Sequence, residues 1–334
     1  MSAIASASRA TLTKVNGLAI GPVRFGMMGL TKPWGPVEYP IAAKVMKTAL
    51  EQGANLWNGG IHYGTPEANS LHLLKYYFQK YPDDASKVVL CIKGGFTGIS
   101  QGPNNTPEGV RASVEEALRV LDGTKAIDIF ECARVDPQVS IETTIKALAE
   151  LVKEGKIQGI GLSEVSASTI RKAHAIHPIS SVEIELSLFT PEPLHNGVAA
   201  TCHELNIPLV AYSPVSRGWL TGNLRTIDDL EVDDRRHLLP RFQPENFDQN
   251  VKLVEAVEKV ARRKGVTTAQ VAIGWVSRVG GIPIPGSVRE ERVIENSKPV
   301  SLNEEDMAEL QKILDSLTVA GARYGSPHEQ YLNA

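Results

Sequence analysis

The sequence predicts an α/β protein of the (β/α)8 barrel type, and three observations support this prediction. Eight short apolar segments alternate with amphipathic segments along the 334 residues, which is typical of a parallel sheet covered by helices. No G-x-G-x-x-G motif follows the first strand, so the dinucleotide-binding fingerprint of an open sheet is missing. Asn16-Gly17 joins two strand-like pieces, which predicts a hairpin able to plug the bottom of a barrel. We therefore expect one barrel domain over residues 1–334.

The expected strands are rich in apolar residues, as in a parallel sheet that is buried on both faces. They cover residues 23–28, 54–58, 88–93, 126–132, 157–162, 181–186, 208–212 and 281–285.

The expected helices show apolar residues at helical spacing and recognisable ends. Gly53 is a good C-terminal stop for the first helix, and Thr106 and Pro107 suit the start of the second. The helices cover residues 41–52, 107–121, 142–154, 166–176, 193–205, 248–264, 268–279 and 303–317. One connection, residues 215–249 after the seventh strand, is long. At the C-terminal face of a barrel, such a loop is expected to lie over the active site.

Charge and composition argue against several classes of partner. The net charge of −3 gives no basic surface for nucleic acid or an anionic membrane, and no apolar run is long enough for a signal peptide or a membrane span. The three cysteines, Cys91, Cys132 and Cys202, lie far apart without metal-ligand spacing. We expect free thiols, no metal site and a cytoplasmic protein, with the nucleus left open. The sequence does not indicate an oligomeric state.

Two residues at strand ends suggest proton chemistry. Lys93 closes an apolar strand, so its side chain either points into the barrel mouth or forms a structural salt bridge with Asp128 or Glu131. Tyr63 follows the second strand and is either a packed aromatic residue or a partner of Lys93. A nearby ammonium group lowers the pKa of a phenol, and such a tyrosine can donate a proton to a carbonyl oxygen during hydride transfer.

These residues belong to a series of motifs that resembles the aldo-keto reductases, from about Val23 to about Asn296. That family has Asp-Thr-Ala and then Tyr-Gly at its second strand, where this chain has Asn58-Gly59-Gly60 and then Tyr63-Gly64. Four further segments are similar to family motifs: GKIQGIGLSEVS at 155–166, VEIELSL at 182–188, AYSPVSRGWLTG at 211–222 and IPGSVREERVIEN at 284–296. The resemblance implies a (β/α)8 barrel and an NADPH-dependent reductase.

Two departures from the family pattern bear on the substrate. Of the usual Asp, Tyr, Lys and His tetrad, Tyr63 and Lys93 remain, whereas Asn58 replaces the Asp and Ala133 replaces the His. Both changes, with the segment 130–136, resemble the pyridoxal reductase branch. The resemblance implies reduction of pyridoxal to pyridoxine, with Tyr63 as proton donor and Asn58 orienting a less strongly held Lys93. We also hypothesise that the substrate's ortho hydroxyl replaces the missing histidine donor.

The resemblance implies a site for NADPH or NADP+ at the ends of the later strands. Glu164 and Glu183 are carboxylates where the family has Asn and Gln. The implied contacts are stacking of Tyr212 on the nicotinamide, carboxamide binding by Ser163 and Glu183, pyrophosphate binding by Ser213, Val215, Arg217 and Gly218, 2′-phosphate binding by Ser287, Arg289 and Arg292, and adenine binding by Glu295 and Asn296. Arginine suits a phosphate because its planar fork pairs with two oxygens. Without this context, Arg289 and Arg292 would read as a solvated helix face.

Other residues are candidates for substrate contact. They are Trp34 on the first loop, His62 beside Tyr63, Ala133, and Arg134, which also offers a pairing partner for Glu131. Two other functions stay open. One is a broad aldehyde or aryl-aldehyde reductase, and the other is an NADPH-sensing binding module like the channel-associated relatives. The sequence does not indicate the preferred reaction direction or whether pyridoxal 5′-phosphate is accepted.

Overall fold

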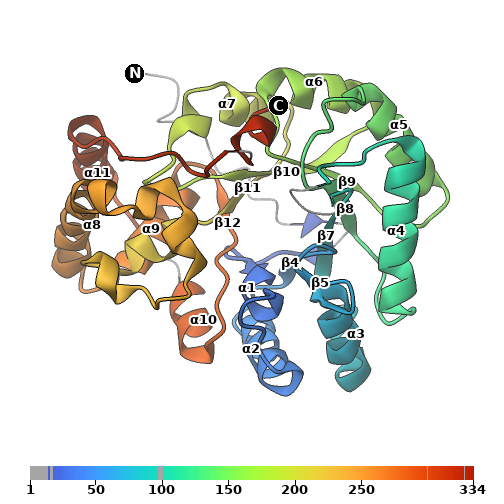
Figure 1. The fold of residues 1–334 in the computed structure, drawn as a ribbon, viewed down its shortest axis with the longest axis horizontal. Coiled ribbons are helices and arrows are strands. Elements are labelled where there is room, and N and C mark those ends of the chain that lie inside the picture. Colours follow the sequence, from blue (N-terminus) through green and yellow to red (C-terminus); the bar gives the residue numbers. More distant parts are fainter. Residues whose placement is uncertain (1–13, 16–17, 97–100, 299, 327) are drawn as a thin grey trace.

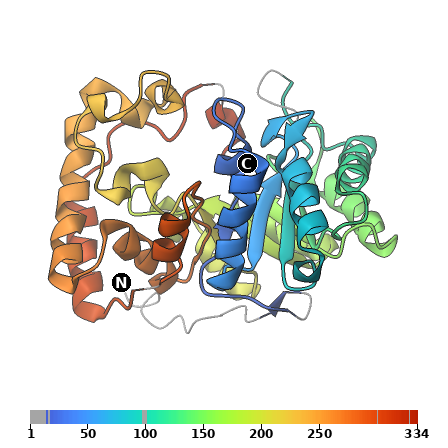
Figure 2. The same ribbon diagram turned by 90° about the horizontal axis from the view of Figure 1, so that it is seen from below.

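The protein is described here by a computed structural model, which places residues 14–15, 18–96, 101–298, 300–326 and 328–334. Eight strands form one parallel sheet that curls into a ring, with the helices outside it (Figures 1 and 2). The sheet order is β12-β11-β10-β9-β8-β7-β4-β3. The main chain of the first strand then meets the end of the last: Arg24 N donates to the Pro283 carbonyl at 3.0 Å and Gly26 N to that of Pro285 at 3.2 Å. The predicted (β/α)8 barrel is confirmed.

All eight predicted barrel strands are present, most of them shorter than expected. They are β3 (Phe25–Gly26), β4 (Leu56–Gly60), β7 (Val89–Gly94), β8 (Ile129–Cys132), β9 (Ile160–Ser163), β10 (Ile179–Glu185), β11 (Leu209–Tyr212) and β12 (Ile282–Pro283). The inward-facing residues of β4, β7 and β8 form a small apolar core of their own, Leu56, Val89, Cys91 and Ile129. The main core lies between the strands and the outer helices.

The predicted hairpin at the start of the chain is also present. β1 (Lys14–Val15) pairs in antiparallel fashion with β2 (Leu18–Ala19), and the Asn16-Gly17 turn lies outside the described residues. The side chain of Asn55, just before β4, donates to the Ala19 carbonyl at 2.8 Å. The hairpin therefore lies at the N-terminal ends of the strands, opposite the face where barrel enzymes place their active sites.

The outer helices include all eight predicted ones, with some shifted ends, and three more that were not predicted. They are α1 (Met28–Thr31), α2 (Tyr39–Glu51), α3 (Ser70–Lys80), α4 (Pro107–Leu121), α5 (Ile141–Lys153), α6 (Ala167–Ile176), α7 (Val198–Glu204), α8 (Pro244–Lys264), α9 (Thr268–Arg278), α10 (Glu290–Asn296) and α11 (Glu304–Ser316). The three that were not predicted are α1, α3 and α10. None of these helices is both long and apolar enough to cross a membrane.

Helix α3 is missing from the predicted set. A short antiparallel pair, β5 (Gly64–Thr65) and β6 (Ala68–Asn69), leads into it. Asn69 caps the helix by accepting from Leu71 N at 2.9 Å. A capping residue followed by apolar residues at helical spacing was a usable signal, so this omission was avoidable.

The long loop after β11 is more ordered than expected. It contains four 3-10 turns, at Ser216–Thr221, Ile227–Asp229, Arg235–Leu238 and Pro240–Phe242. Trp219 anchors it, because its ring is fully buried against Phe189 and Phe242. A loop with its own apolar anchor can hold residues over a site.

Candidate active site

Lys93 lies at the centre of a buried polar group inside the barrel. Its ammonium group donates to Asn58 Oδ1 at 2.9 Å and pairs with Glu131 Oε1 at 2.8 Å and Glu183 Oε1 at 2.6 Å. The amide of Asn58 donates in turn to Glu183 Oε2 at 2.6 Å. We call these four residues the Lys93 cluster. All four are buried and come from four different strands of the barrel.

The Lys93 cluster contains two carboxyl groups for one ammonium group. Burial raises the pKa of Glu183 to about 8; Lys93 opposes this increase and Glu131 adds to it. Burial lowers the pKa of Lys93, but the two glutamates outweigh it, so this pKa lies well above its usual value. The expectation that Asn58 leaves Lys93 less strongly held is therefore wrong, because the glutamates supply the missing charge.

The salt-bridge interpretation of Lys93 is thus correct for Glu131, whereas Asp128 pairs with Lys125 at 2.8 Å. An ammonium group has three N–H donors, and three groups surround that of Lys93: the Asn58 amide oxygen and the carboxylates of Glu131 and Glu183. Lys93 acts on its surroundings through its charge.

Tyr63 lies at the C-terminal ends of the strands, beside this cluster. Lys93 Nζ is 6.0 Å from the centroid of its ring. The Thr31 hydroxyl fixes the turn by donating to the Tyr63 carbonyl at 2.6 Å. A side chain at Gly60 would come within 3.2 Å of the ring, so glycine at this position allows the ring to lie over the strand end.

The expected lowering of the Tyr63 pKa is wrong. Burial raises this pKa to about 12, because it outweighs the opposing charge of Lys93. Glu183 and Glu131 add to the increase. The phenol therefore keeps its proton at neutral pH, and the protonated form is the one that can donate.

His62 and Ala133 lie on the predicted substrate side. His62 Nδ1 is buried and has no hydrogen-bond partner among the described residues. Burial, helped by Lys93 and Arg134, lowers the pKa of His62 to about 3, so the ring is neutral at pH 7. The backbone of Ala133 donates to the Gly94 carbonyl at 2.9 Å, and its side chain offers only a methyl group.

Arg134 and Trp34 make contacts within the protein that the sequence did not predict, and their contacts with the substrate stay predictions. The proposed pairing of Glu131 with Arg134 is wrong, because Glu131 pairs with Lys93. The Trp34 ring is 42% exposed, and the Arg235 guanidinium from the long loop stacks on it at 4.2 Å from the centroid. Trp34 and the long loop therefore contact each other at the same face.

Backbone strain is concentrated at the predicted cofactor positions. Seven described residues other than glycine have positive φ, and three of these are Asp or Asn, which tolerate that region. The other four follow β9 or β11: Glu164, Ser213, Ser216 and Arg217, with φ between 52° and 56°. Strained backbone of this kind clusters at functional sites. This signal is structural and independent of any motif.

The residues present fit a nicotinamide cofactor. Ser163 Oγ is buried and has no hydrogen-bond partner in the described part of the chain, so a ligand amide would satisfy it. Ser216, Arg217 and Gly218 are successive residues with positive φ in the segment predicted to bind the pyrophosphate. Glu183 is bound within the Lys93 cluster, and its part in binding the carboxamide stays a prediction.

A second group of buried charges joins the barrel to the end of the chain. Glu164 Oε2 pairs with Arg323 at 2.7 Å, and Glu185 Oε2 pairs with Arg217 at 2.8 Å. The Arg217 guanidinium lies 4.3 Å from the centroid of the Tyr324 ring. We call these five residues the tail cluster. Glu185 lies in the motif-like segment at 182–188 but was not singled out, and no sequence motif pointed to Arg323 or Tyr324.

The tail cluster brings the C-terminal segment onto the site. The Tyr324 hydroxyl is 3.2 Å from that of Tyr212, the residue expected to stack on the nicotinamide. The last residue, Ala334, accepts from Ser166 N at 2.8 Å. In Figure 1 the tail, in dark red, runs from α11 across the barrel to this point. The tail, predicted only as a loop, thus forms part of the wall of the site.

The predicted phosphate-binding residues lie at and before α10. Arg292 pairs with Glu295 at 3.0 Å, and Glu295 also accepts from Thr267 at 2.7 Å. Arg289 is more exposed and approaches Glu291 at 3.5 Å. Ser287 Oγ accepts from Arg289 N at 3.1 Å. The loop and helix thus gather two guanidinium groups after β12, where barrels commonly bind phosphate.

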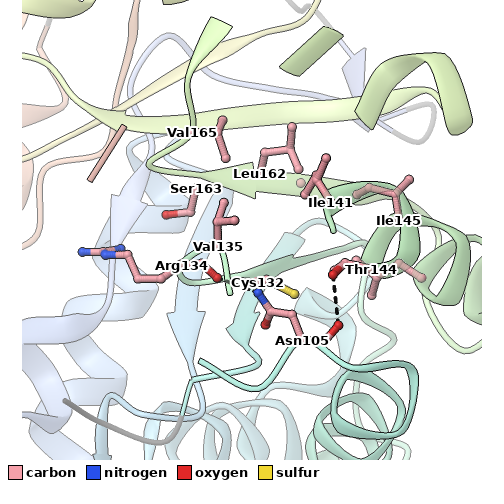
Figure 3. Close-up of a pocket in the computed structure, with 12 residues that line it drawn as sticks. Asn105, Cys132, Arg134, Val135, Ile141, Thr144, Ile145, Leu162, Ser163 and Val165 are labelled. Carbon is pink, nitrogen blue, oxygen red and sulfur yellow. Dashed lines mark hydrogen bonds between the residues drawn. The ribbon is translucent and has the colours of Figure 1, made fainter. Parts of the chain in front are cut away.

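A narrow cavity between β8, β9 and α5 borders this site, because Arg134 and Ser163 are among its lining residues. Most of its lining residues are apolar, among them Leu162, Ile141 and Ile145 (Figure 3). In the same view Arg134 points away from these side chains (Figure 3). We interpret the cavity as a packing gap.

Comparison with known proteins agrees with this geometry. The model of the aldo/keto reductase family matches residues 22–315. The chain belongs to the aldo/keto reductase family. It is 42% identical to the probable pyridoxal reductase 2 of Schizosaccharomyces pombe, over 96% of this chain and 99% of that protein. It is 36% identical to an aldo-keto reductase of Gibberella moniliformis, over 90% and 92% of the two chains.

The solved structure of the glycerol dehydrogenase of Gluconobacter oxydans has the same fold as this aldo/keto reductase. The two chains superpose with a TM-score of 0.82 at 21% identity, covering 94% of this chain and 98% of the other. This likeness supports the barrel assignment.

Proposed function

We propose that this aldo/keto reductase reduces pyridoxal to pyridoxine with NADPH. The observation that carries the proposal is the placement of Tyr63 at the barrel mouth beside the buried Lys93 cluster. The 42% identity to a probable pyridoxal reductase supports the choice of substrate, as do Asn58 and Ala133 at the two altered tetrad positions.

The chain's own residues divide the work of the reaction. NADPH supplies the hydride when bound. The Tyr63 hydroxyl donates its proton to the carbonyl oxygen of the substrate. The charge of Lys93 opposes the pKa increase that burial imposes on Tyr63, so it stabilises the phenolate that forms. Asn58 and the two glutamates hold Lys93 in place.

NADPH is the proposed cofactor because Arg289 and Arg292 lie together after β12. A charge-assisted hydrogen bond is worth about 1.5–3 kcal/mol. Replacing both arginines with alanine should therefore weaken NADPH binding about tenfold or more and leave NADH binding unchanged. Fluorescence titration of both nucleotides measures this. If NADPH and NADH binding weakened equally, Arg289 and Arg292 would not be the residues that bind the 2′-phosphate.

The direct assay follows NADPH oxidation by absorbance with pyridoxal, 4-nitrobenzaldehyde and pyridoxal 5′-phosphate as substrates. A clear preference for pyridoxal supports the proposal. Equal or faster reduction of 4-nitrobenzaldehyde would indicate a broad aldehyde reductase. Tight NADPH binding without steady turnover would indicate a nucleotide-sensing module.

A further inference from the structure

Arg134 stands apart from the other cations at the barrel mouth. Lys93, Arg217 and Arg323 each pair with a buried glutamate. Within the described ranges, the Arg134 guanidinium forms no ion pair. Its only hydrogen bond there runs from Nη1 to the Ala133 carbonyl at 2.5 Å. A guanidinium has five N–H donors, so most of those of Arg134 are left for water or a ligand.

The main chain of Arg134 is nevertheless held firmly. The Asn105 amide donates to the Arg134 carbonyl at 2.7 Å. Asn105 is itself fixed, because its N–H donates to Asp136 at 3.1 Å and its carbonyl accepts from Thr144 at 2.9 Å. Glu164 is the carboxylate whose charge acts on Arg134, and it is already paired with Arg323, so the Arg134 guanidinium keeps N–H donors for an anion.

Arg134 lies between the cofactor and substrate sides of the barrel mouth, because its charge interacts with Tyr212, Tyr324 and Glu164 as well as with Tyr63. Its charge acts on both Tyr63 and His62, in the same sense as that of Lys93. His62 Nδ1 is buried without a partner among the residues that the structure places. Arg134 also follows Ala133 directly, and Ala133 stands where the family has its histidine donor.

We propose that Arg134 determines substrate specificity by pairing with an anionic oxygen on the ring carbon next to the aldehyde. This inference rests on the proposed function and names its substrate class: aldehydes with an ionised ortho hydroxyl. The guanidinium fork places two parallel N–H groups in one plane. One N–H reaches the ortho oxygen and the other the aldehyde oxygen beside it, so Arg134 provides the donor that Ala133 lacks.

Pyridoxal belongs to this class because its electron-poor ring makes the 3-hydroxyl acidic. The proposal differs from the hypothesis that a neutral hydroxyl donates to its own aldehyde, since an ionised oxygen has no proton to donate. Both accounts predict that the substrate preference depends on the ortho oxygen. Only the present proposal predicts that it also depends on Arg134.

The test compares kcat/KM for pyridoxal and 3-O-methylpyridoxal in the wild-type enzyme and in Arg134→Met, Arg134→Lys and Lys32→Met. Methionine replaces the aliphatic part of the side chain without its charge, and the Asn105 contact to the backbone is unaffected, so folding should be retained; thermal unfolding checks this. Lys32→Met is the matched control, because it removes one positive charge from the neighbouring first loop.

We expect the wild-type enzyme to prefer pyridoxal about tenfold to a hundredfold, the value of one charge-assisted hydrogen bond. The preference should fall to within about threefold in Arg134→Met, persist in part in Arg134→Lys and stay unchanged in Lys32→Met. An unchanged preference in Arg134→Met would overturn the proposal, as would equal loss of activity on both substrates.

A binding measurement separates this inference from the proposed function. Calorimetry with NADP+ present compares pyridoxine and 3-O-methylpyridoxine without turnover. If NADPH is not oxidised with pyridoxal but Arg134→Met still abolishes a preference for pyridoxine, the inference stands and the proposed function fails. If pyridoxal is reduced but neither binding nor kcat/KM depends on Arg134, the inference fails and the proposed function stands.

Discussion

The Lys93 cluster and the tail cluster both bury glutamates beside cations, yet they differ in origin and in charge. The Lys93 cluster draws all its members from barrel strands and has two carboxyl groups for one ammonium group. The tail cluster links strand ends to a segment 159 positions away and has one guanidinium for each of its two carboxylates.

This difference in charge balance changes what each cluster does with protons. In the acid-rich Lys93 cluster, the pKa of Glu183 rises to about 8, chiefly through burial. In the balanced tail cluster, burial raises the pKa of Glu164, but pairing with Arg323 outweighs it, and the pKa is lowered. The first arrangement suits proton chemistry, and the second suits anchoring.

The largest expected effect comes from removing the Tyr63 hydroxyl, the proposed proton donor beside the Lys93 cluster. Tyr63→Phe should lower kcat for pyridoxal by about 10²–10⁴-fold, the usual value of a general acid. No described residue hydrogen-bonds to the Tyr63 hydroxyl, so stability should change by less than about 0.5 kcal/mol. Steady-state kinetics and thermal unfolding measure both. Tyr76→Phe, on α3, is the matched control, and an active Tyr63→Phe enzyme would contradict the assignment.

Lys93→Met breaks the Lys93 cluster itself. Two glutamates would stay buried without a cation, which costs about 3–5 kcal/mol of unfolding free energy, and activity should fall with it. Urea unfolding gives the first quantity and NADPH oxidation the second. Lys125→Met removes another buried lysine pair, outside the site; it should lose stability and keep its activity. Full activity in a folded Lys93→Met enzyme would show that the Lys93 cluster takes no part in the reaction.

Glu183→Gln tests whether the Glu183 carboxyl group binds a proton in the folded protein up to about pH 8. Because the folded pKa is raised, the stability that Glu183 contributes is fully present below its ordinary pKa of 4.5 and is lost as the pH rises through about 8. We expect the unfolding free energy of the wild type to fall relative to that of Glu183→Gln across this window. Urea unfolding at several pH values measures the difference, and parallel curves would show that Glu183 binds no extra proton.

The smallest expected effect concerns the tail cluster. Glu164→Gln should leave global stability nearly unchanged but loosen residues 318–334, since the lost pair is worth about 1–3 kcal/mol. Hydrogen exchange of this segment should speed up about tenfold. In the wild type, the lowered pKa of Glu164 means that the anchoring is present above pH 4.5 and weakens below it.

The control for this change is Arg171→Met, which breaks an exposed pair with Glu204 and should alter neither tail exchange nor stability by more than about 0.5 kcal/mol. Unchanged exchange in Glu164→Gln would mean that other contacts hold the tail.

The barrel was predictable from sequence because its signal is local. Each apolar strand and each amphipathic helix is visible within a short window, and even the omitted α3 carried a cap at Asn69. Tyr63, Lys93 and Asn58 were visible as motif positions at strand ends. The hydrogen bond from Lys93 to Asn58 was expected and is present.

The charges around these residues were not predictable in the same way. That Glu183 pairs with Lys93 depends on how β10 faces β7 across the barrel interior, which no local pattern encodes. The raised pKa of Tyr63 depends on the degree of burial. Arg323 and Tyr324 lie in a polar tail without periodicity, and their contacts with Glu164 and Arg217 arise only from the folded chain.

The measurement closest to the central claim is product analysis after incubation with NADPH and pyridoxal, by chromatography. We predict one pyridoxine for each NADPH oxidised by the wild-type enzyme, and none above background for Tyr63→Phe at equal nucleotide binding. Pyridoxal left unchanged by a folded, NADPH-binding wild-type enzyme would contradict the account.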